Sequence, residues 1–287
     1  MKNNLKIVYF GTSDFSVSIL QELLLAEIEP VLIVTAPDRP KGRGMEISPP
    51  PVKVWADEHN ISTIQPEKLD EEVMGELTNT PPAGGWDLFI VAAYGGILPK
   101  RMLDIPKHKT LNVHPSLLPK FRGSSPIQTT ILEDEKKTGV TIMLVDEEVD
   151  HGPIVAQASI ELDELPKARE LEALLAHEGG VLLAETIPLW TAGDITPEEQ
   201  DHVAATYTKR ITKENGLLDL NGDAHENFKK IKAYDGWPGT YFFTKDGKRV
   251  KVIDATYEDG KLTITRVIPE GRQETAYEDF VKTNDGA

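Results

Sequence analysis

The sequence contains no cysteine and no long apolar run. Because cysteine is absent from all 287 residues, disulfides, thiolate metal sites and a cysteine nucleophile are excluded. No stretch approaches the roughly 18 consecutive apolar residues of a membrane-spanning helix. The apolar run LKIVYF near the N-terminus ends at Gly11 and is too short for a signal peptide. These absences predict a cytoplasmic protein, and 39% apolar residues allow a substantial core.

Common catalytic signatures are missing as well. The chain has no G-x-S-x-G nucleophile elbow of serine hydrolases and no phosphate-binding G-x-x-x-x-G-K-[ST] loop. Its seven histidines show no H-E-x-x-H spacing. A metal site built from His114, Asp150 and His151 is the disfavoured alternative, and we expect no metal.

Basic residues are scarce in the middle of the chain. The net charge of −16 arises entirely within residues 56–204, which hold 11 basic and 27 acidic residues. Because an acidic surface repels nucleic-acid phosphates, any contact with nucleic acid must use local basic patches. The clearest patch is DRPKGRGMEISPPPVK, 38–53, which holds four basic and two acidic residues and shows no obvious regular structure.

Short apolar runs alternate with helix-like stretches over the first 160 residues. Most of these runs lack a two-residue period, which is typical of strands buried on both faces in a parallel sheet. The alternation predicts a doubly wound α/β domain. The expected strands are 5–10, 30–35, 88–93, 110–113, 139–145 and 154–160, and the expected helices are 16–28, 52–60, 126–135 and 168–190.

The pattern changes after a polar stretch, 191–206, that contains glycine and proline. Beyond it, short alternating strands with Asp-Gly turns at 246–247 and 259–260 predict a small antiparallel sheet or partial barrel. One helix is expected before these strands, over 223–234. We therefore predict a catalytic domain over 1–190, a linker over 191–206 and a second domain over 207–287.

One candidate phosphate site follows the first expected strand. The stretch GTSDFS, 11–16, places a glycine between a strand and a helix, as in a dinucleotide-binding turn. The G-x-G-x-x-G spacing is absent, and no acidic residue closes the second strand. This favours a plain tight turn over a phosphate cradle.

The stretch NVHPSLLP, 112–119, combines polar and apolar side chains where a strand must stop. Residues two apart in a strand project from one face, so Asn112 and His114 form a same-face pair, and Pro115 ends the strand. Ligands of doubly wound sheets bind beyond the carboxyl ends of strands. Histidine can move a proton near neutral pH, and an asparagine amide can donate to an oxyanion. The alternative is a capping asparagine beside a surface histidine.

The catalytic interpretation requires a carboxylate that orients His114. The stretch VDEEVDHGPI, 145–154, offers Asp150 beside a Gly-Pro turn in another strand-end loop. Glu147 and Glu148 in the same stretch are more typical of a solvated acidic turn. We predict Asn112, His114 and Asp150 as the catalytic residues.

These motifs resemble the signature of a known family. The stretch NVHPSLLPKFRGSSPIQ, 112–128, followed by TGVTIMLVDEEVDHGPI, 138–154, is similar to the 10-formyltetrahydrofolate-dependent formyltransferases. The resemblance covers essentially the whole chain, in order. Further matching stretches are IVYFGTSDF (7–15), VTAPDRPKGRG (34–44), SPPPVK (48–53), IQPEKL (64–69), VAAYGGILP (91–99) and YDGWPGTY (234–241).

The resemblance implies a Rossmann-like formyltransferase domain with a mostly parallel sheet, followed by a small OB-like β-barrel, which the short C-terminal segment of this chain would leave shortened. It implies an enzyme that formylates the α-amino group of methionyl initiator tRNA from 10-formyltetrahydrofolate, for translation initiation. A monomer is the default expectation. In the family the matching Asn, His and Asp are catalytic. The implied folate-binding residues are Ser116, Leu117, Leu118, Pro119, Tyr94, Gly95 and Ile97, and the implied tRNA-binding residues are Arg39, Lys41, Arg43 and Lys53.

Two other functions stay open at this point. One is formyl transfer to a small amine such as a nucleotide-linked amino sugar, although such an enzyme has no need of the basic loop. The other is a non-catalytic folate- or nucleotide-binding module, which the predicted catalytic residues oppose. The chain departs from the family pattern at His151, where threonine is usual, at Glu148, where glycine is common, and in its short C-terminal segment.

Overall fold

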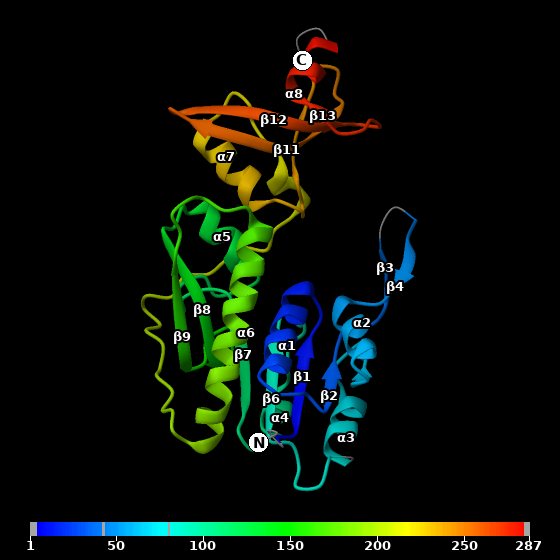
Figure 1. Ribbon diagram of the computed structural model, residues 1–287, viewed down its shortest axis with the longest axis vertical. Coiled ribbons are helices and arrows are strands. Elements are labelled where there is room, and N and C mark those ends of the chain that lie inside the picture. Colours follow the sequence, from blue (N-terminus) through cyan, green and yellow to red (C-terminus); the bar gives the residue numbers. More distant parts are fainter. Residues whose placement is uncertain (1–4, 42–43, 80, 284–287) are drawn as a thin grey trace. The chain divides into compact units, whose positions relative to one another are not determined.

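A seven-stranded sheet organises the N-terminal part of the protein. A computed structural model describes residues 5–41, 44–79 and 81–283. The strand order is β5-β2-β1-β6-β7-β8-β9 (Figure 1). The strands from β5 to β7 run parallel, whereas β8 runs antiparallel to β7, which confirms a mostly parallel sheet. The bounds are β1 (Ile7–Gly11), β2 (Leu32–Val34), β5 (Ser62–Ile64), β6 (Leu88–Ala92), β7 (Thr110–His114), β8 (Lys137–Leu144) and β9 (Ile154–Glu161).

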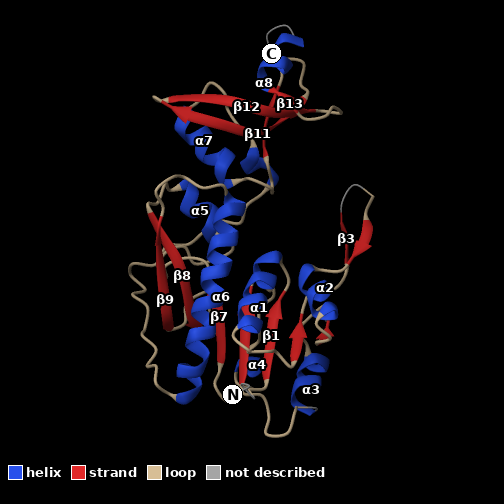
Figure 2. Ribbon diagram, in the orientation of Figure 1, coloured by secondary structure: helices blue, strands red, loops and turns tan. Residues whose placement is uncertain are grey.

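Helices connect these strands, as Figure 2 shows. All six strands and the four helices predicted for this part are present, with ends shifted by up to three residues. Strand β5 and helices α3 and α4 were not predicted, because they are short and bury few apolar side chains. The helices are α1 (Asp14–Leu25), α2 (Pro51–Glu58), α3 (Glu71–Asn79), α4 (Lys100–Leu103), α5 (Pro126–Leu132) and α6 (Ala168–Ala192).

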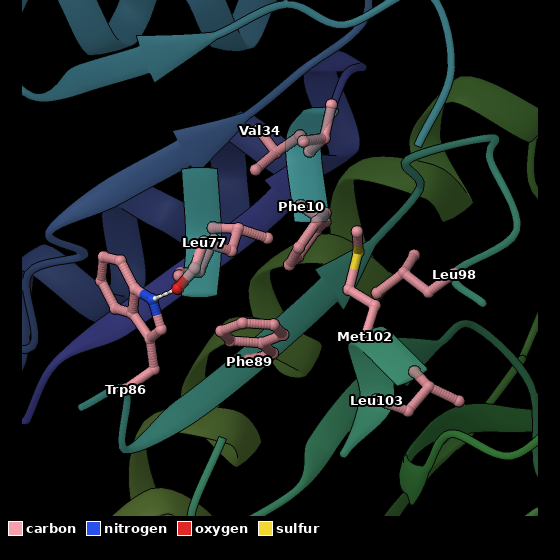
Figure 3. Close-up of a cluster of buried hydrophobic side chains, with 10 residues drawn as sticks. Phe10, Val34, Leu77, Trp86, Phe89, Leu98, Met102 and Leu103 are labelled. Atoms are coloured by element: carbon pink, nitrogen blue, oxygen red, sulfur yellow. Dashed lines mark hydrogen bonds between the residues drawn. The ribbon is translucent and has the colours of Figure 1, made fainter. Parts of the chain in front are cut away.

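Strand β1 is buried on both faces of the sheet. Phe10 belongs to an apolar cluster with Leu77 of α3 and Met102 of α4 (Figure 3). Tyr9 lies on the opposite face, where its hydroxyl donates to the Ser16 carbonyl in α1 at 3.0 Å. Burial raises the pKa of this hydroxyl far above its usual range. Because helices cover both faces, the apolar runs show no two-residue period.

Helix α6 packs closely against the sheet and α1 through two adjacent glycines. A Cβ on Gly179 would lie 2.9 Å from a Val113 methyl in β7, and one on Gly180 would lie 2.6 Å from Glu22 in α1. Glycine weakens a helix interior by about 0.5–1 kcal/mol, and the close packing of three elements offsets this cost. Val113 therefore faces α6, and its two polar neighbours in β7 face the other side.

The basic stretch 38–53 is more ordered than its sequence indicates. It forms a two-stranded antiparallel hairpin, β3 (Arg39–Lys41) with β4 (Glu46–Ser48), followed by α2. The prediction of no regular structure is therefore wrong for these residues. A three-residue ladder that contains Pro40 has no apolar alternation for a pattern search to detect.

Contacts divide the chain into two compact units. The first comprises residues 1–122, 139–159 and 173–206, and the second comprises 123–138, 160–172 and 207–287. No helix within the described ranges combines the length and the apolar character needed to cross a membrane.

The second unit contains the predicted antiparallel sheet, in the order β10-β11-β12-β13. The turn between β11 and β12 is the predicted Asp-Gly pair, with Asp259 at φ 51° and Gly260 at φ 78°, as a type I′ hairpin requires. The expected helix forms as α7. The bounds are η1 (Lys213–Gly216), α7 (Ala224–Ala233), β10 (Thr240–Phe243), β11 (Arg249–Glu258), β12 (Lys261–Pro269), β13 (Thr275–Ala276) and α8 (Tyr277–Thr283).

Candidate active site

The site is built on the last residues of β7. His114 is 4% exposed and Asn112 is half-buried, whereas Val113 is buried on the opposite face. Both polar side chains contact the carboxylate of Asp150, as the predicted same-face geometry requires. The strand therefore supplies two of the three predicted catalytic side chains in a fixed relative orientation.

Asp150 reaches this face from a strand that runs the other way. Because β8 is antiparallel to β7, Leu144 at the end of β8 lies beside Leu111 near the start of β7. The loop after β8 then folds back, and the Leu144 amide donates to the Pro153 carbonyl at 2.9 Å. Asp150 lies in this loop as predicted, but the ends of β7 and β8 do not meet at one edge of the sheet.

One carboxylate oxygen contacts both other side chains. Oδ1 of Asp150 lies 3.4 Å from Nδ2 of Asn112 and 3.5 Å from Nδ1 of His114. The carboxylate side chain is 15% exposed and the imidazole 5%, so water screens the cluster weakly. The structure thus brings together the three residues that the sequence singled out.

The contact made by Nε2 of His114 shows which ring nitrogen carries the hydrogen. Nε2 lies 3.0 Å from the Phe121 carbonyl oxygen, which only accepts hydrogen bonds, so Nε2 is the donor. Nδ1 is therefore the ring nitrogen that faces Oδ1 of Asp150. Phe121 has φ 62°, a conformation that costs a bulky residue about 1–3 kcal/mol. This strained turn directs its carbonyl toward the imidazole.

The Asp150 loop has little room to shift. Asp150 itself has φ 50°, in the left-handed region that aspartate tolerates better than most residues. A Cβ on Gly152 would lie 2.1 Å from the Leu144 carbonyl oxygen, so only glycine permits this approach. The Gly152 carbonyl also accepts a hydrogen bond from Gln200 at 2.7 Å. The loop is therefore held on two sides.

The predicted folate segment SLLP is a tightly bonded loop. Ser116 and Leu118 are buried. The Thr141 hydroxyl donates to the Ser116 carbonyl at 2.7 Å and accepts from the Leu118 amide at 3.1 Å. The Gln157 amide donates to the Leu118 carbonyl at 2.8 Å. These two predicted residues therefore fix the shape of the loop.

The other predicted folate residues are more accessible. Leu117 and Pro119 are half-exposed. Tyr94, Gly95 and Ile97 follow β6, the neighbour of β7 in the sheet. Ile97 is 82% exposed, and burial raises the pKa of the Tyr94 hydroxyl, which keeps the phenol neutral. Together they offer apolar surface and a neutral hydroxyl near the carboxyl ends of two adjacent strands.

Two of the predicted tRNA-binding residues can be described with their side chains, Arg39 in β3 and Lys53 in α2. The Arg39 guanidinium pairs with Glu67, and the Lys53 ammonium pairs with the carboxylate four residues on along α2. Exposed pairs of this kind are worth about 0–1 kcal/mol, so a phosphate can displace them. The side chain of Lys41 and the whole of Arg43 lie outside the described residues.

Two buried polar side chains beside the site were not predicted. Arg122 is 1% exposed and Gln200 is 4% exposed. The Arg122 guanidinium donates to Oε1 of Gln200 from Nε at 3.0 Å and from Nη2 at 2.6 Å. These residues are 78 positions apart, so no local pattern links them. The one sequence signal for this pair is that Arg122 lies inside the stretch 112–128 that resembles the family motif.

The stretch predicted as a linker is bonded to the loop after β7. The Thr206 hydroxyl accepts from the Phe121 amide at 2.8 Å, and the Thr206 carbonyl accepts from the Arg122 amide at 2.9 Å. These bonds hold the strained turn that presents the Phe121 carbonyl to the histidine. A polar sequence with glycine and proline gave no sign of this role.

Two of the three departures from the family pattern, His151 and Glu148, belong to a neighbouring turn. Nδ1 of His151 lies 2.7 Å from Oδ2 of Asp146, and its ring stacks on His202 with 4.1 Å between centroids. Glu148 is exposed, and its amide donates to Asp146 at 3.0 Å. Among the described residues, no group of three or more potential ligands is placed to hold a metal.

The arrangement suits acyl-group transfer through a tetrahedral intermediate. An amide donor lies beside a histidine–carboxylate pair, so a developing oxyanion and a moving proton can both be accommodated in a weakly screened site. The doubly wound fold places this cluster against the accessible loops after β6 and β7, where such folds bind ligands. The fold and the site therefore define a group-transfer enzyme.

Comparison with known proteins gives the family. Residues 5–187 match the formyl transferase family, and residues 210–285 match the formyl transferase C-terminal domain. The chain belongs to the formyl transferase family.

Relatives and solved structures agree with this family. The methionyl-tRNA formyltransferase of Bacillus subtilis (strain 168) is 38% identical over 96% of this chain and 94% of its own. That of Sulfurihydrogenibium sp. (strain YO3AOP1) is 39% identical over 98% and 89%.

Two solved structures share the fold. The Helicobacter canadensis N-formyltransferase, solved with folinic acid and dTDP-3-aminofucose, has a TM-score of 0.67, 19% identity, and coverage of 95% of this chain and 98% of its own. The methionyl-tRNA formyltransferase of Clostridium thermocellum has a TM-score of 0.60, 18% identity, and coverage of 92% and 98%.

Proposed function

We propose that the protein transfers the formyl group of 10-formyltetrahydrofolate to the α-amino group of methionyl initiator tRNA, for translation initiation. The observation that carries this proposal is the cluster of Asn112, His114 and Asp150 around one carboxylate oxygen. The methionyl-tRNA formyltransferases that are 38% and 39% identical over nearly the whole chain support the choice of acceptor.

The first step is attack by the neutral α-amine on the formyl carbon. A new C–N bond forms, and the formyl oxygen becomes an oxyanion. Asn112 donates an amide N–H to this oxygen, an interaction worth about 3–4 kcal/mol, or roughly 10²–10³ in rate. A free α-amino group titrates near about 7.7–8.0, so much of it is neutral without a strong base.

The second step moves one proton. The amine loses a proton as it adds, and N10 of the folate must gain one before the C–N10 bond breaks. Nδ1 of His114 and Oδ1 of Asp150, 3.5 Å apart, hold the proton in transit between the two nitrogens. Formylmethionyl-tRNA and tetrahydrofolate leave, and the proton balance closes without another reactant.

The folate is a co-substrate that binds beside this cluster. In our proposal, Leu117, Pro119, Tyr94 and Ile97 contact its rings, and Gly95 lets the backbone approach. The buried Ser116 and Leu118 act by shaping the loop.

The alternative acceptor is a small amine such as a nucleotide-linked amino sugar. The observation behind it is an N-formyltransferase solved with dTDP-3-aminofucose, which has a TM-score of 0.67, against 0.60 for a methionyl-tRNA formyltransferase. Because both identities are below 20%, these scores concern the fold alone.

A competition assay tests the acceptor. Purified protein and 10-formyltetrahydrofolate are supplied with methionyl initiator tRNA together with a dTDP-linked amino sugar. We expect formylmethionyl-tRNA and no formylated sugar. Turnover of the sugar without transfer to the tRNA would overturn the proposal.

The hairpin gives a test of tRNA recognition. We expect Arg39→Glu to raise KM for methionyl-tRNA about 5–20-fold with kcat nearly unchanged, because a phosphate contact is lost far from the reacting atoms. Initial rates at several salt concentrations would measure this, and the slope of log KM against log salt should fall by about 0.7–0.9. Lys107→Glu, the same kind of charge reversal at an exposed site in the first unit, is the control. Equal effects of the two variants would remove the hairpin from the tRNA interface.

The domain boundaries follow from the same proposal. We propose a formyltransferase domain over 1–190, a connecting segment over 191–206 and a C-terminal domain over 207–287, supported by family matches that end at 187 and begin at 210. We also propose that the protein is a monomer and acts in the cytoplasm, where charged tRNA is used.

A further inference from the structure

Gln200 hydrogen-bonds through its side-chain amide to two backbone carbonyls of the Asp150 loop. We propose that Gln200 is a positioning residue for formyl transfer, whose buried amide holds the Asp150 loop so that the carboxylate meets Asn112 and His114. This inference rests on the function proposed above and extends it to a residue outside the three catalytic side chains.

The Gln200 amide bridges two carbonyls of the loop. Nε2 donates to the Asp150 carbonyl at 3.0 Å and to the Gly152 carbonyl at 2.7 Å. An amide nitrogen carries two hydrogens, so these two bonds use its full donor capacity. The two carbonyls flank His151, and fixing both defines the backbone from which the Asp150 carboxylate projects.

Arg122 determines which way the amide points. Its guanidinium donates to Oε1 of Gln200 from two nitrogens. Because arginine has no acceptor, the atom that faces it must be the amide oxygen, and the nitrogen must face the loop. The reversed amide would place its N–H groups against the Arg122 donors and its oxygen against the two loop carbonyls, between side chains that are almost fully buried.

The backbone around Gln200 is tied to the sheet. The Ile154 amide donates to the Glu198 carbonyl at 2.7 Å, and the Glu198 amide donates back at 2.8 Å. Ile154 is the first residue of β9, so the segment that carries Gln200 is paired with a regular strand. A rigid support of this kind is what a group needs to hold a catalytic loop within a fraction of an ångström.

The most informative variant is Gln200→Glu. A carboxylate has nearly the same shape and keeps an acceptor for Arg122, but it cannot donate to the carbonyls of Asp150 and Gly152. Gln21→Glu, the same substitution at an exposed position of α1, is the matched control. Gln200→Asn, which keeps the amide one methylene shorter, carries the test if the glutamate variant does not fold.

Hydrogen exchange measures how often the Asp150 loop opens, and it needs no substrate. We expect amides in the peptide 144–154 to exchange about tenfold faster in Gln200→Glu than in Gln21→Glu, because the loop opens more often. Exchange of the β1 and β6 peptides should be unchanged. Equal protection of 144–154 in the two variants would overturn the positioning role.

Formyl transfer then tests whether the loop matters to the chemistry. We expect kcat for methionyl-tRNA to fall about 10–100-fold in Gln200→Glu with KM changed less than about twofold, since a misplaced carboxylate impairs the step and not binding. In an Asp150→Asn background the same substitution should cost less than about twofold, because Gln200 acts through that carboxylate.

Each result supports or overturns the inference. A kcat equal to that of Gln21→Glu, or a loss of the same size with and without the Asp150 carboxylate, would overturn it. If wild-type protein does not formylate the tRNA, the proposed function fails, and hydrogen exchange alone then decides whether Gln200 holds the loop.

Discussion

Replacing His114 with alanine is expected to abolish turnover while tetrahydrofolate still binds. His114 is buried between the Phe121 carbonyl and the Asp150 carboxylate, and its Nδ1 takes part in the proposed proton transfer between the two nitrogens. Loss of general acid–base catalysis typically costs about 10²–10⁴ in rate. The predicted folate surface lies on other residues, so the dissociation constant for tetrahydrofolate should change by less than about threefold.

A second variant separates proton transfer from packing. His114→Gln keeps an amide donor for the Phe121 carbonyl but cannot take up a proton, so we expect it to be nearly as inactive as His114→Ala. His108→Ala, a half-buried histidine that precedes the same strand, is the control and should retain most activity. Near wild-type rates for either substitution at position 114 would refute the role given to this histidine.

Gly152→Ala is expected to impair both stability and activity. Its Cβ would lie 2.1 Å from the Leu144 carbonyl oxygen, and the backbone cannot retreat because Leu144 is also bonded to Pro153. Overpacking of this kind costs about 1–3 kcal/mol, which lowers the melting temperature by about 2–12 °C for a chain of this size. Asp150, two residues earlier, would shift with the loop, and kcat should fall more than about tenfold.

Gly75→Ala is the matched control for this prediction. Gly75 lies in α3, where a Cβ would contact only the flexible Asn79 side chain at 3.4 Å. Alanine in a helix is favoured over glycine by about 0.5–1 kcal/mol, so this variant should melt slightly higher. Thermal unfolding followed by circular dichroism would compare the two. A Gly152→Ala protein as stable and active as wild type would show that the loop is not tightly confined.

Much of the fold could be predicted because strong local patterns produced it. The apolar runs of β1, β6 and β7 are buried on both faces of the sheet, and the Asp259-Gly260 turn requires positive φ at both residues. Such features depend on a few adjacent residues. The hairpin β3–β4 could not be predicted in the same way, because its short strands bury almost nothing.

The catalytic pair in β7 was also accessible to sequence reasoning, since a spacing of two places both side chains on one face. The path of the Asp150 loop could not be predicted from the sequence. It depends on β8 running antiparallel to β7 and on contacts of Gly152 with Leu144, which no local pattern records. Gln200 is the clearest case, because its significance lies in bonds to residues about 50 and 78 positions away.

The central claim is that the Asn112–His114–Asp150 cluster receives the formyl group. A crystal structure of the protein with 5-formyltetrahydrofolate, a stable relative of the co-substrate, would test it most directly. We predict the formyl oxygen within about 3.5 Å of Nδ2 of Asn112, with the folate rings against Leu117 and Ile97. A folate bound with its formyl group beyond hydrogen-bonding reach of all three side chains would contradict the account.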